Sequence, residues 1–152
     1  MAAAYRKILV AVDGSKASAK GLREALRLAK AQRARLLILH VVDEYPALAA
    51  LDGMMAGAPG ADLVPALREG GKRVLARAKK TAAAAGVPAV TLLREMLSGP
   101  AAYPIVREAK KQRADLIVLG THGRRGVRRL VLGSDAEQVV RSASVPVLLV
   151  RA

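Results

Sequence analysis

Short apolar runs alternate along the chain with segments whose apolar residues recur at helical spacing. We interpret the apolar runs as buried strands, at residues 7–12, 35–42, 88–97, 115–119 and 145–150. The amphipathic segments between them are interpreted as helices, at residues 15–30, 62–85, 101–113 and 134–142. Strands without polar alternation, separated by helices, predict a parallel sheet covered by helices on both faces. The pattern therefore predicts an α/β fold in a single domain over residues 1–152.

Residues 43–60 follow neither pattern. This segment contains two prolines and three glycines, which favour turns over a continuous element. We expect a loop that is long for a compact domain and is therefore either functional or mobile. Met54 and Met55 within it form either a flexible contact surface or part of an ordinary loop.

The amino-acid composition excludes several classes of functional site. The chain has no cysteine, which excludes a disulfide scaffold, a thiolate metal site and a cysteine nucleophile. Its aromatic residues are three tyrosines, too few for a platform on which single-stranded bases would stack. The formal net charge is +14, which attracts anions such as nucleotides, nucleic acids, acidic lipids or acidic proteins, unless the arginines are only ordinary surface cations.

No apolar run approaches the roughly 18 residues that a membrane-spanning helix requires. The residues before the first strand also lack the apolar stretch of a signal peptide. We therefore expect a cytoplasmic protein that has no membrane partner.

Two loops are candidates for ligand binding, because ligands of open α/β sheets bind beyond the carboxyl ends of the strands. Asp13, Gly14 and Ser15 follow the first strand, and Ser15 is the expected N-cap of the helix that comes next. A glycine-rich segment from Gly120 to Ser134 follows the fourth strand. Glycines let backbone amides approach an anion, and the start of the following helix adds free amides and a positive dipole end. The segment is thus either a phosphate-binding loop or a plain turn with a serine N-cap. The P-loop and dinucleotide-binding motifs are absent.

Three segments resemble the universal stress protein family over nearly the whole chain: YRKILVAVDGS, LLILHVVD and GTHGRRGVRRLVLGSDAEQVVRSASVPVLLVR. ATP-binding members of that family carry the pattern G-x2-G-x9-G-[ST]. Gly120, Gly123, Gly133 and Ser134 match it at every fixed position. The resemblance implies a five-stranded parallel sheet of order 3-2-1-4-5, an adenine nucleotide alpha hydrolase-like (Rossmann-like) fold, and a homodimer.

The resemblance also implies a role for each matching residue. Asp13 would lie beside the ribose and phosphates, near a nucleotide-bound cation, and the backbone of Val41 would recognise adenine. Ala11 and Val12 would flank the base or sugar, and the glycines and Ser134 would hold the ribose and phosphates. The full set of expected ATP-binding residues is Ala11, Val12, Asp13, Val41, Gly120, Thr121, His122, Gly123, Gly133, Ser134 and Asp135.

Two positions depart from the family pattern. Ala11 stands where many relatives have proline, a change that affects mainly local rigidity. Asp135 stands where relatives often have a small apolar residue. Its carboxylate either repels phosphate, shares a divalent cation with it, or points to solvent and favours the helix N-terminus.

Other polar residues have two interpretations each. His122 either donates to a phosphate or forms a hydrogen bond within its turn, whereas His40, at the end of an apolar strand, is interpreted as a structural histidine. Two distant histidines without cysteine exclude a standard zinc site. A cluster of arginines either clamps a triphosphate, forms a basic patch for a partner, or is a solvated loop: Arg124, Arg125, Arg128 and Arg129.

These observations predict an ATP-binding, homodimeric stress-response regulator that uses Mg²⁺ or Mn²⁺ and acts on a downstream protein that the sequence does not identify. No nucleophile elbow or general base is evident, so no catalytic residue is predicted, and any ATP hydrolysis is expected to be slow. The alternatives are a stress protein that acts through protein contacts without nucleotide, a non-specific nucleic-acid-binding protein, and a phosphotransferase. Sequence-specific nucleic-acid binding is not expected.

The last strand is the predicted dimer interface. In the order 3-2-1-4-5 it lies at an edge of the sheet, and it carries no charge before Arg151. Exposed edges of this kind pair with other chains. The interface residues are expected to be Val145, Val147, Leu148, Leu149 and Val150.

Overall fold

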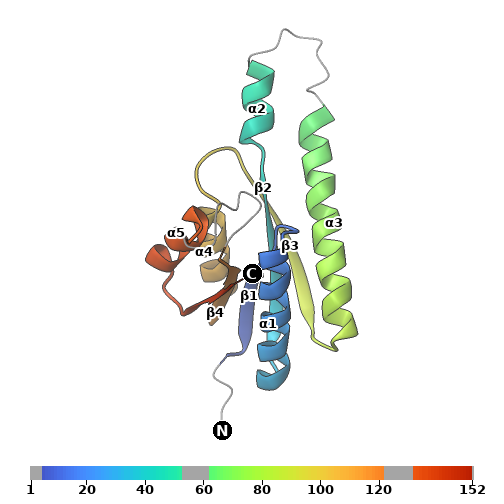
Figure 1. The fold of residues 1–152 in the computed structure, drawn as a ribbon, viewed down its shortest axis with the longest axis vertical. Coiled ribbons are helices and arrows are strands. Elements are labelled where there is room, and N and C mark those ends of the chain that lie inside the picture. The colour runs from blue at the N-terminus through green and yellow to red at the C-terminus, as the bar shows by residue number, and fades with distance from the viewer. Residues whose placement is uncertain (1–4, 53–61, 122–131, 152) are drawn as a thin grey trace.

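The computed structural model describes residues 5–52, 62–121 and 132–151. The strands are β1 (Lys7–Ala11), β2 (Arg35–Asp43), β3 (Ala89–Met96), β4 (Leu116–Gly120) and β5 (Val147–Val150). The helices are α1 (Lys16–Gln32), α2 (Tyr45–Asp52), α3 (Leu63–Ala84), α4 (Ala102–Gln112) and α5 (Ser134–Ser142). The strands form one parallel sheet in the order β3-β2-β1-β4-β5, which confirms the predicted fold class (Figure 1).

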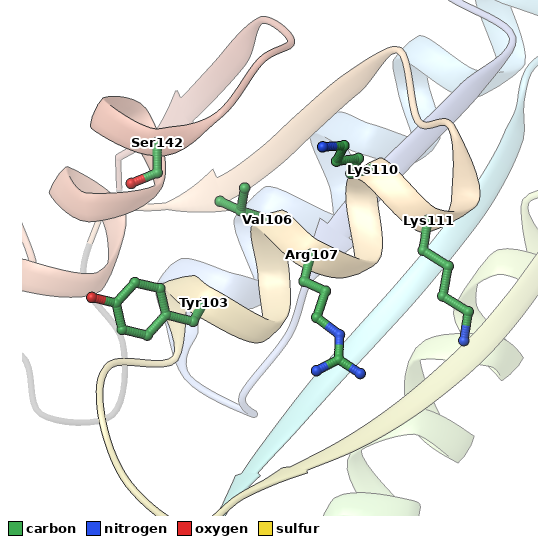
Figure 2. Close-up of a pocket in the computed structure, with 6 residues that line it drawn as sticks. All are labelled: Tyr103, Val106, Arg107, Lys110, Lys111 and Ser142. Carbon is green, nitrogen blue, oxygen red and sulfur yellow. The ribbon is translucent and has the colours of Figure 1, made fainter.

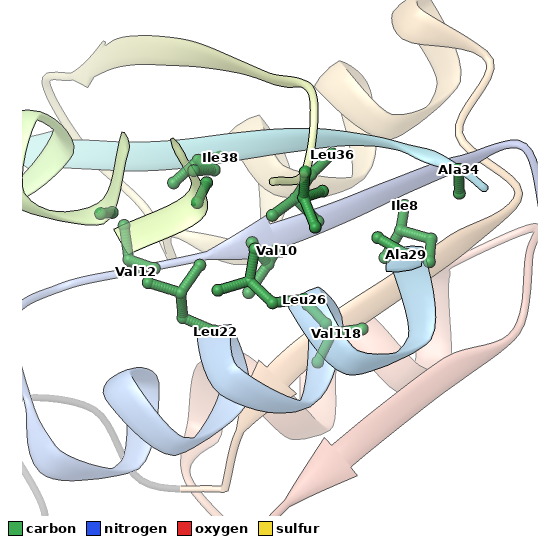
Figure 3. Packing of buried hydrophobic residues seen from close by; sticks show 14 of the residues in the cluster. Ile8, Val10, Val12, Leu22, Leu26, Ala29, Ala34, Leu36, Ile38 and Val118 are labelled. Carbon is green, nitrogen blue, oxygen red and sulfur yellow. The ribbon is translucent and has the colours of Figure 1, made fainter. Parts of the chain in front are cut away.

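The sheet separates two hydrophobic cores, because successive side chains of a strand point to opposite faces. Ile8 and Val10 point into a core beneath α1 and α3, together with Leu36 and Ile38 from β2 (Figure 3). Leu9 points to the opposite face, into the core that α4 and α5 cover. Helices on both faces explain why the strands are apolar at consecutive positions, so their sequences show no alternation.

Helix α1 begins and ends where the local chemistry predicts. The Ser15 hydroxyl accepts a hydrogen bond from the Ser18 amide, so Ser15 is the N-cap, as predicted. The buried face consists mainly of alanine and leucine, including Leu22, Ala25 and Leu26. Arg33 ends the helix in the left-handed conformation (φ 53°), and its amide donates to the carbonyls of the last turn.

The prediction of a loop over residues 43–60 is wrong for its first half, which forms α2. Asp43 begins this helix by accepting a hydrogen bond from the Tyr45 amide at 3.1 Å, and Pro46 sits in the first turn, where no amide is required. Ala47 is fully buried, whereas Tyr45 is exposed. The sequence of α2 is almost uniformly apolar, so it has no polar face to reveal helical periodicity. Met54 and Met55 lie outside the described residues.

Two arginines form three ion pairs that the sequence pattern did not reveal and that connect elements around the sheet. The guanidinium of Arg68 on α3 lies 2.6 Å from buried Glu44 and 3.1 Å from Glu95. The guanidinium of Arg94 on β3 binds both carboxylate oxygens of buried Glu108 on α4 at 2.8 Å. The hydrogen bond from Arg94 lowers the pKa of Glu108 below its ordinary value despite burial. These ion pairs fix α3 and α4 to the edge strand β3, and α3 also to Glu44, the residue that follows β2.

No helix in the described ranges is both long enough and apolar enough to cross a membrane.

Candidate functional site

Three of the predicted binding residues lie at the carboxyl edge of neighbouring strands of the sheet. Val10 of β1 pairs with Ile38 of β2 and with Val118 of β4. Counting three residues onward from each places Asp13, Val41 and Thr121 side by side at the carboxyl edge. The strand order reverses at β1 and β4, so this edge is the place where open α/β sheets bind ligands.

Both backbone groups of Val12 are held by β2 at this edge. Its amide donates to the carbonyl of Leu39 at 2.8 Å, and its carbonyl lies 2.7 Å from Nδ1 of His40. Because a carbonyl only accepts, the Nδ1 atom of His40 must carry the proton. His40 is buried, so its interpretation as a structural histidine is confirmed. It fixes the course of the chain into the loop that carries Asp13.

Asp13 and the start of α1 form one hydrogen-bonded turn. The Asp13 carboxylate accepts from the Ser15 amide at 2.8 Å, and the Asp13 amide donates to the Ser18 hydroxyl at 3.2 Å. That hydroxyl also donates to the Ser15 carbonyl. Sequence reasoning missed Ser18, although a serine three residues after a predicted N-cap is a recognisable signal. The turn holds the Asp13 side chain at the carboxyl edge.

The backbone of Val41 faces the space beyond the end of β1. The carbonyl of Leu39 points toward β1, where it accepts from Val12. Backbone groups two residues apart in a strand point to the same side, so those of Val41 also face β1. Strand β1 ends at Ala11, which pairs with Leu39, and therefore stops short of Val41. The position suits recognition of a ligand by main-chain groups.

Gly120, at the end of β4, has a packing role that the sequence did not reveal. A Cβ atom at this position would lie 2.6 Å from the carbonyl carbon of Ala17 and 2.8 Å from its oxygen. Gly21, one turn later on α1, also approaches the Gly120 amide closely. Glycine at 120 therefore allows α1 to lie directly against β4. This role is separate from the predicted contact with a ligand.

Helix α5 presents an uncapped N-terminus to the same edge. Buried Thr121 donates its amide to Val150 and accepts at its carbonyl from the Gly133 amide, both at 2.9 Å. Gly133 is the N-cap, and in the described part of the chain no side chain caps this helix. The interpretation of Ser134 as an N-cap is therefore wrong, because Ser134 is the first helical residue. The amides of the first turn have no partner within the helix, and the dipole makes this end positive.

The polar side chains of the first turn are open to solvent. Ser134 and Asp135 are both exposed, and the Glu137 carboxylate pairs with Arg141 one turn later. The exposed Asp135 agrees with the interpretation that it points to solvent and favours the helix N-terminus. An anion bound by the backbone amides could therefore also contact the Ser134 hydroxyl, because Ser134 is exposed.

Some predicted residues lie outside the described ranges. These are His122 and Gly123, together with the arginine cluster Arg124, Arg125, Arg128 and Arg129. Ala11 is the last residue of β1 and is half-buried. Within the described residues, no group of three or more His, Cys, Asp or Glu side chains is placed to bind a metal ion.

A groove elsewhere on the surface is lined by none of the predicted binding residues. It lies along α4 and the end of α5, has a volume of about 670 Å³, and is lined by Tyr103, Val106, Arg107, Lys110, Lys111 and Ser142 (Figure 2). Its side chains come from the exposed side of α4 and not from the carboxyl edge of the sheet. The groove is therefore distinct from the candidate site.

The sequence and the fold are similar to those of known proteins. The sequence matches the Universal stress protein family profile over residues 4–151. A universal stress protein from Methanocaldococcus jannaschii is 39% identical over 147 residues, which cover 97% of this chain and 82% of the relative. A solved structure from the same family in Burkholderia pseudomallei is 36% identical, with a TM-score of 0.77 and 98% of each chain covered. A universal stress protein solved in complex with cAMP is 26% identical, with a TM-score of 0.63 and 97% of each chain covered. The family profile matches nearly the whole chain, and relatives are more than a third identical to it over the aligned residues. This chain therefore belongs to the universal stress protein family.

Proposed function

We propose that this protein binds an adenine nucleotide, ATP together with Mg²⁺ or Mn²⁺, at the carboxyl edge of β1, β2 and β4. The observation that carries the proposal is the N-terminus of α5, which no side chain of the described residues caps and which coincides with Gly133 and Ser134 of the G-x2-G-x9-G-[ST] pattern. In contrast, the N-terminus of α1 is capped by its own Ser15. The complex of a related universal stress protein with cAMP supports the same class of ligand.

Different residues of the site bind different parts of the nucleotide. The amides of the first turn of α5 and the Ser134 hydroxyl bind phosphate oxygens, since these donors match a negative charge. The backbone of Val41 faces adenine, and Ala11 and Val12 flank the base or sugar. Asp13 lies beside the ribose and phosphates, where a divalent cation offsets the repulsion between its carboxylate and the phosphates.

We further propose that the protein acts as a regulator in the cytoplasm, through its nucleotide-bound state and not through turnover. Backbone amides and a helix terminus bind a phosphate chain without supplying a general base to activate water. Nucleotide occupancy would then change how the carboxyl edge of the sheet meets a downstream protein.

Titration calorimetry tests the proposed binding. With Mg²⁺ present, ATP should bind with a dissociation constant in the micromolar range, about −8 kcal/mol. Absence of both heat and a thermal shift at millimolar ATP would contradict the proposal and favour a stress protein that acts through protein contacts alone.

The proposed homodimer forms through β5, which is an edge strand of the sheet. The carbonyls of Pro146 and Val150 point toward β4, where they accept from Ile117 and Thr121. Backbone groups alternate along a strand, so those of Val147 and Leu149 face the open edge. All four side chains of β5 are half-buried against the two cores, so pairing of the backbone, and not of a projecting side chain, would join two copies.

A proline at the edge tests this interface. Leu149→Pro removes an amide that faces the open edge, and Leu149→Ala removes the same side chain but keeps that amide. Sedimentation equilibrium should give a mass near twice 15.9 kDa for the unaltered protein and for Leu149→Ala, and a monomer for Leu149→Pro. A dimeric Leu149→Pro protein would place the interface elsewhere, and a monomeric unaltered protein at tens of micromolar would refute the dimer.

A further inference from the structure

Much of the positive charge of the described residues lies on the face of the sheet that α1 and α3 cover. These helices hold eleven Lys and Arg residues, five in α1 and six in α3, against the two acids Glu24 and Glu69. Both acids are already paired, with Arg27 and Lys72. On the opposite face of the sheet, α4 and α5 hold four basic residues and three acids. Among these four described helices, the excess of positive charge therefore lies on the face that α1 and α3 cover.

Eight of these eleven cations form two rows that point away from the sheet. Residues spaced three and four apart lie on one side of a helix, and the buried residues of α1 and α3 lie on the opposite side. The row on α1 consists of the exposed residues Lys16, Lys20, Arg23, Arg27 and Lys30. The row on α3 consists of the exposed residues Arg73, Arg77 and Lys80.

The two rows run side by side. Both helices pack on the same core and run in the same direction in Figure 1. Helix α1 contacts β1 and β4, whereas α3 contacts β2 and β3, so the helices are offset by two strands, about 10 Å. At a rise of 1.5 Å per residue, the α1 row from Lys16 to Lys30 is about 21 Å long. The face is therefore a rigid, two-row array of cations.

We infer that this face binds the phosphate backbone of double-stranded nucleic acid, without reading the base sequence. Two parallel rows of cations match the two rows of phosphates that border a groove, the major groove being about 12 Å wide. The array lacks aromatic side chains, which single-strand binding requires for base stacking. The binding is independent of the proposed nucleotide site, because neither row contains a residue assigned to that site.

The same face does not suit insertion into a membrane. Helices that lie in a bilayer surface bury large apolar side chains in it. On α1 no large hydrophobic side chain is exposed, and on α3 the exposed one is Leu63, at the first residue of the helix. The apolar faces of both helices are already buried against the sheet. The face is therefore suited to electrostatic attraction by phosphates at a surface and not to apolar insertion.

A pair of charge-matched variants tests the inference. Lys20→Gln, Arg23→Gln and Lys80→Gln together remove three cations from the two rows. Arg107→Gln, Lys110→Gln and Lys111→Gln remove the same kinds of residue from the α4 groove of Figure 2. Each triple variant lowers the net charge from +14 by three, and glutamine keeps the helix propensity high. Circular dichroism and thermal melting check that both variants fold.

Fluorescence anisotropy with a labelled DNA duplex of mixed sequence provides the readout, between about 50 and 200 mM salt. We expect the α1–α3 variant to bind the duplex at least about tenfold more weakly than the unaltered protein. The slope of its log affinity against log salt concentration should be shallower by nearly three. The affinity of the α4 variant for the duplex should change less than about threefold. Equal weakening of both variants would overturn the inference in favour of bulk charge. Failure of the unaltered protein to bind the duplex would also overturn it, as would tighter binding to phosphatidylcholine–phosphatidylserine vesicles than to the duplex. ATP titration of the α1–α3 variant should be unchanged, which separates this inference from the proposed nucleotide site.

Discussion

Replacing Gly133 by valine should weaken ATP binding about a hundredfold while leaving the fold intact. A branched side chain at the N-cap of α5 would stand between the phosphates and the amides of the first turn. Losing two hydrogen bonds to a charged group, at about 1.5 kcal/mol each, corresponds to that loss of affinity. The backbone of Gly133 (φ −58°, ψ 143°) is one that valine adopts readily, so the free energy of unfolding should fall by no more than about 1 kcal/mol.

Gly70→Val is the matched control for this substitution. Gly70 lies on α3, where an added Cβ would meet only the guanidinium of Arg73, at 3.9 Å. Titration calorimetry should find the same ATP affinity for this variant as for the unaltered protein. Normal ATP binding by Gly133→Val would show that the loop before α5 is only a turn.

Replacing Gly120 by alanine should lower the free energy of unfolding by about 3 kcal/mol, because it overpacks the contact between β4 and α1. The new Cβ would overlap the backbone of Ala17, which cannot rotate away as the end of a side chain can. Helix α1 is itself fixed by Leu22, Ala25 and Leu26 in the core, so relief requires the whole helix to shift. The dihedral angles of Gly120 lie outside the positive-φ region, so the cost is steric and does not arise from backbone strain.

Denaturant unfolding measures this cost, with Gly70→Ala as its control. The control position is open and helical, where alanine should stabilise the protein by about 0.5 to 1 kcal/mol. A Gly120→Ala protein as stable as the unaltered chain would mean that α1 and β4 do not lie as close as described. In that case the role of Gly120 would be limited to the proposed ligand contact.

Some features of the candidate site could be predicted from the pattern of residue types, and others could not. The glycine spacing located Gly133 and Ser134 at the start of a helix, and the turn chemistry of Asp13 and Ser15 predicted the cap of α1, which the hydrogen bonds confirm. The pattern did not predict the packing contact at Gly120 or the bond from His40 to Val12. Both depend on residues from different strands and helices meeting in space. The local sequence around Gly120 or His40 does not indicate which distant residue each of them contacts.

The sequence by itself determined the order and type of most elements, because a buried parallel strand must be apolar and a surface helix must be amphipathic. It failed at α2, whose nearly uniform apolar composition carries no helical period. The tertiary structure alone decided the register that aligns Asp13, Val41 and Thr121, since register is set by packing between strands and not within them. It also decided that the basic residues of α1 and α3 share one face, because that depends on which side of the sheet each crossover places its helix.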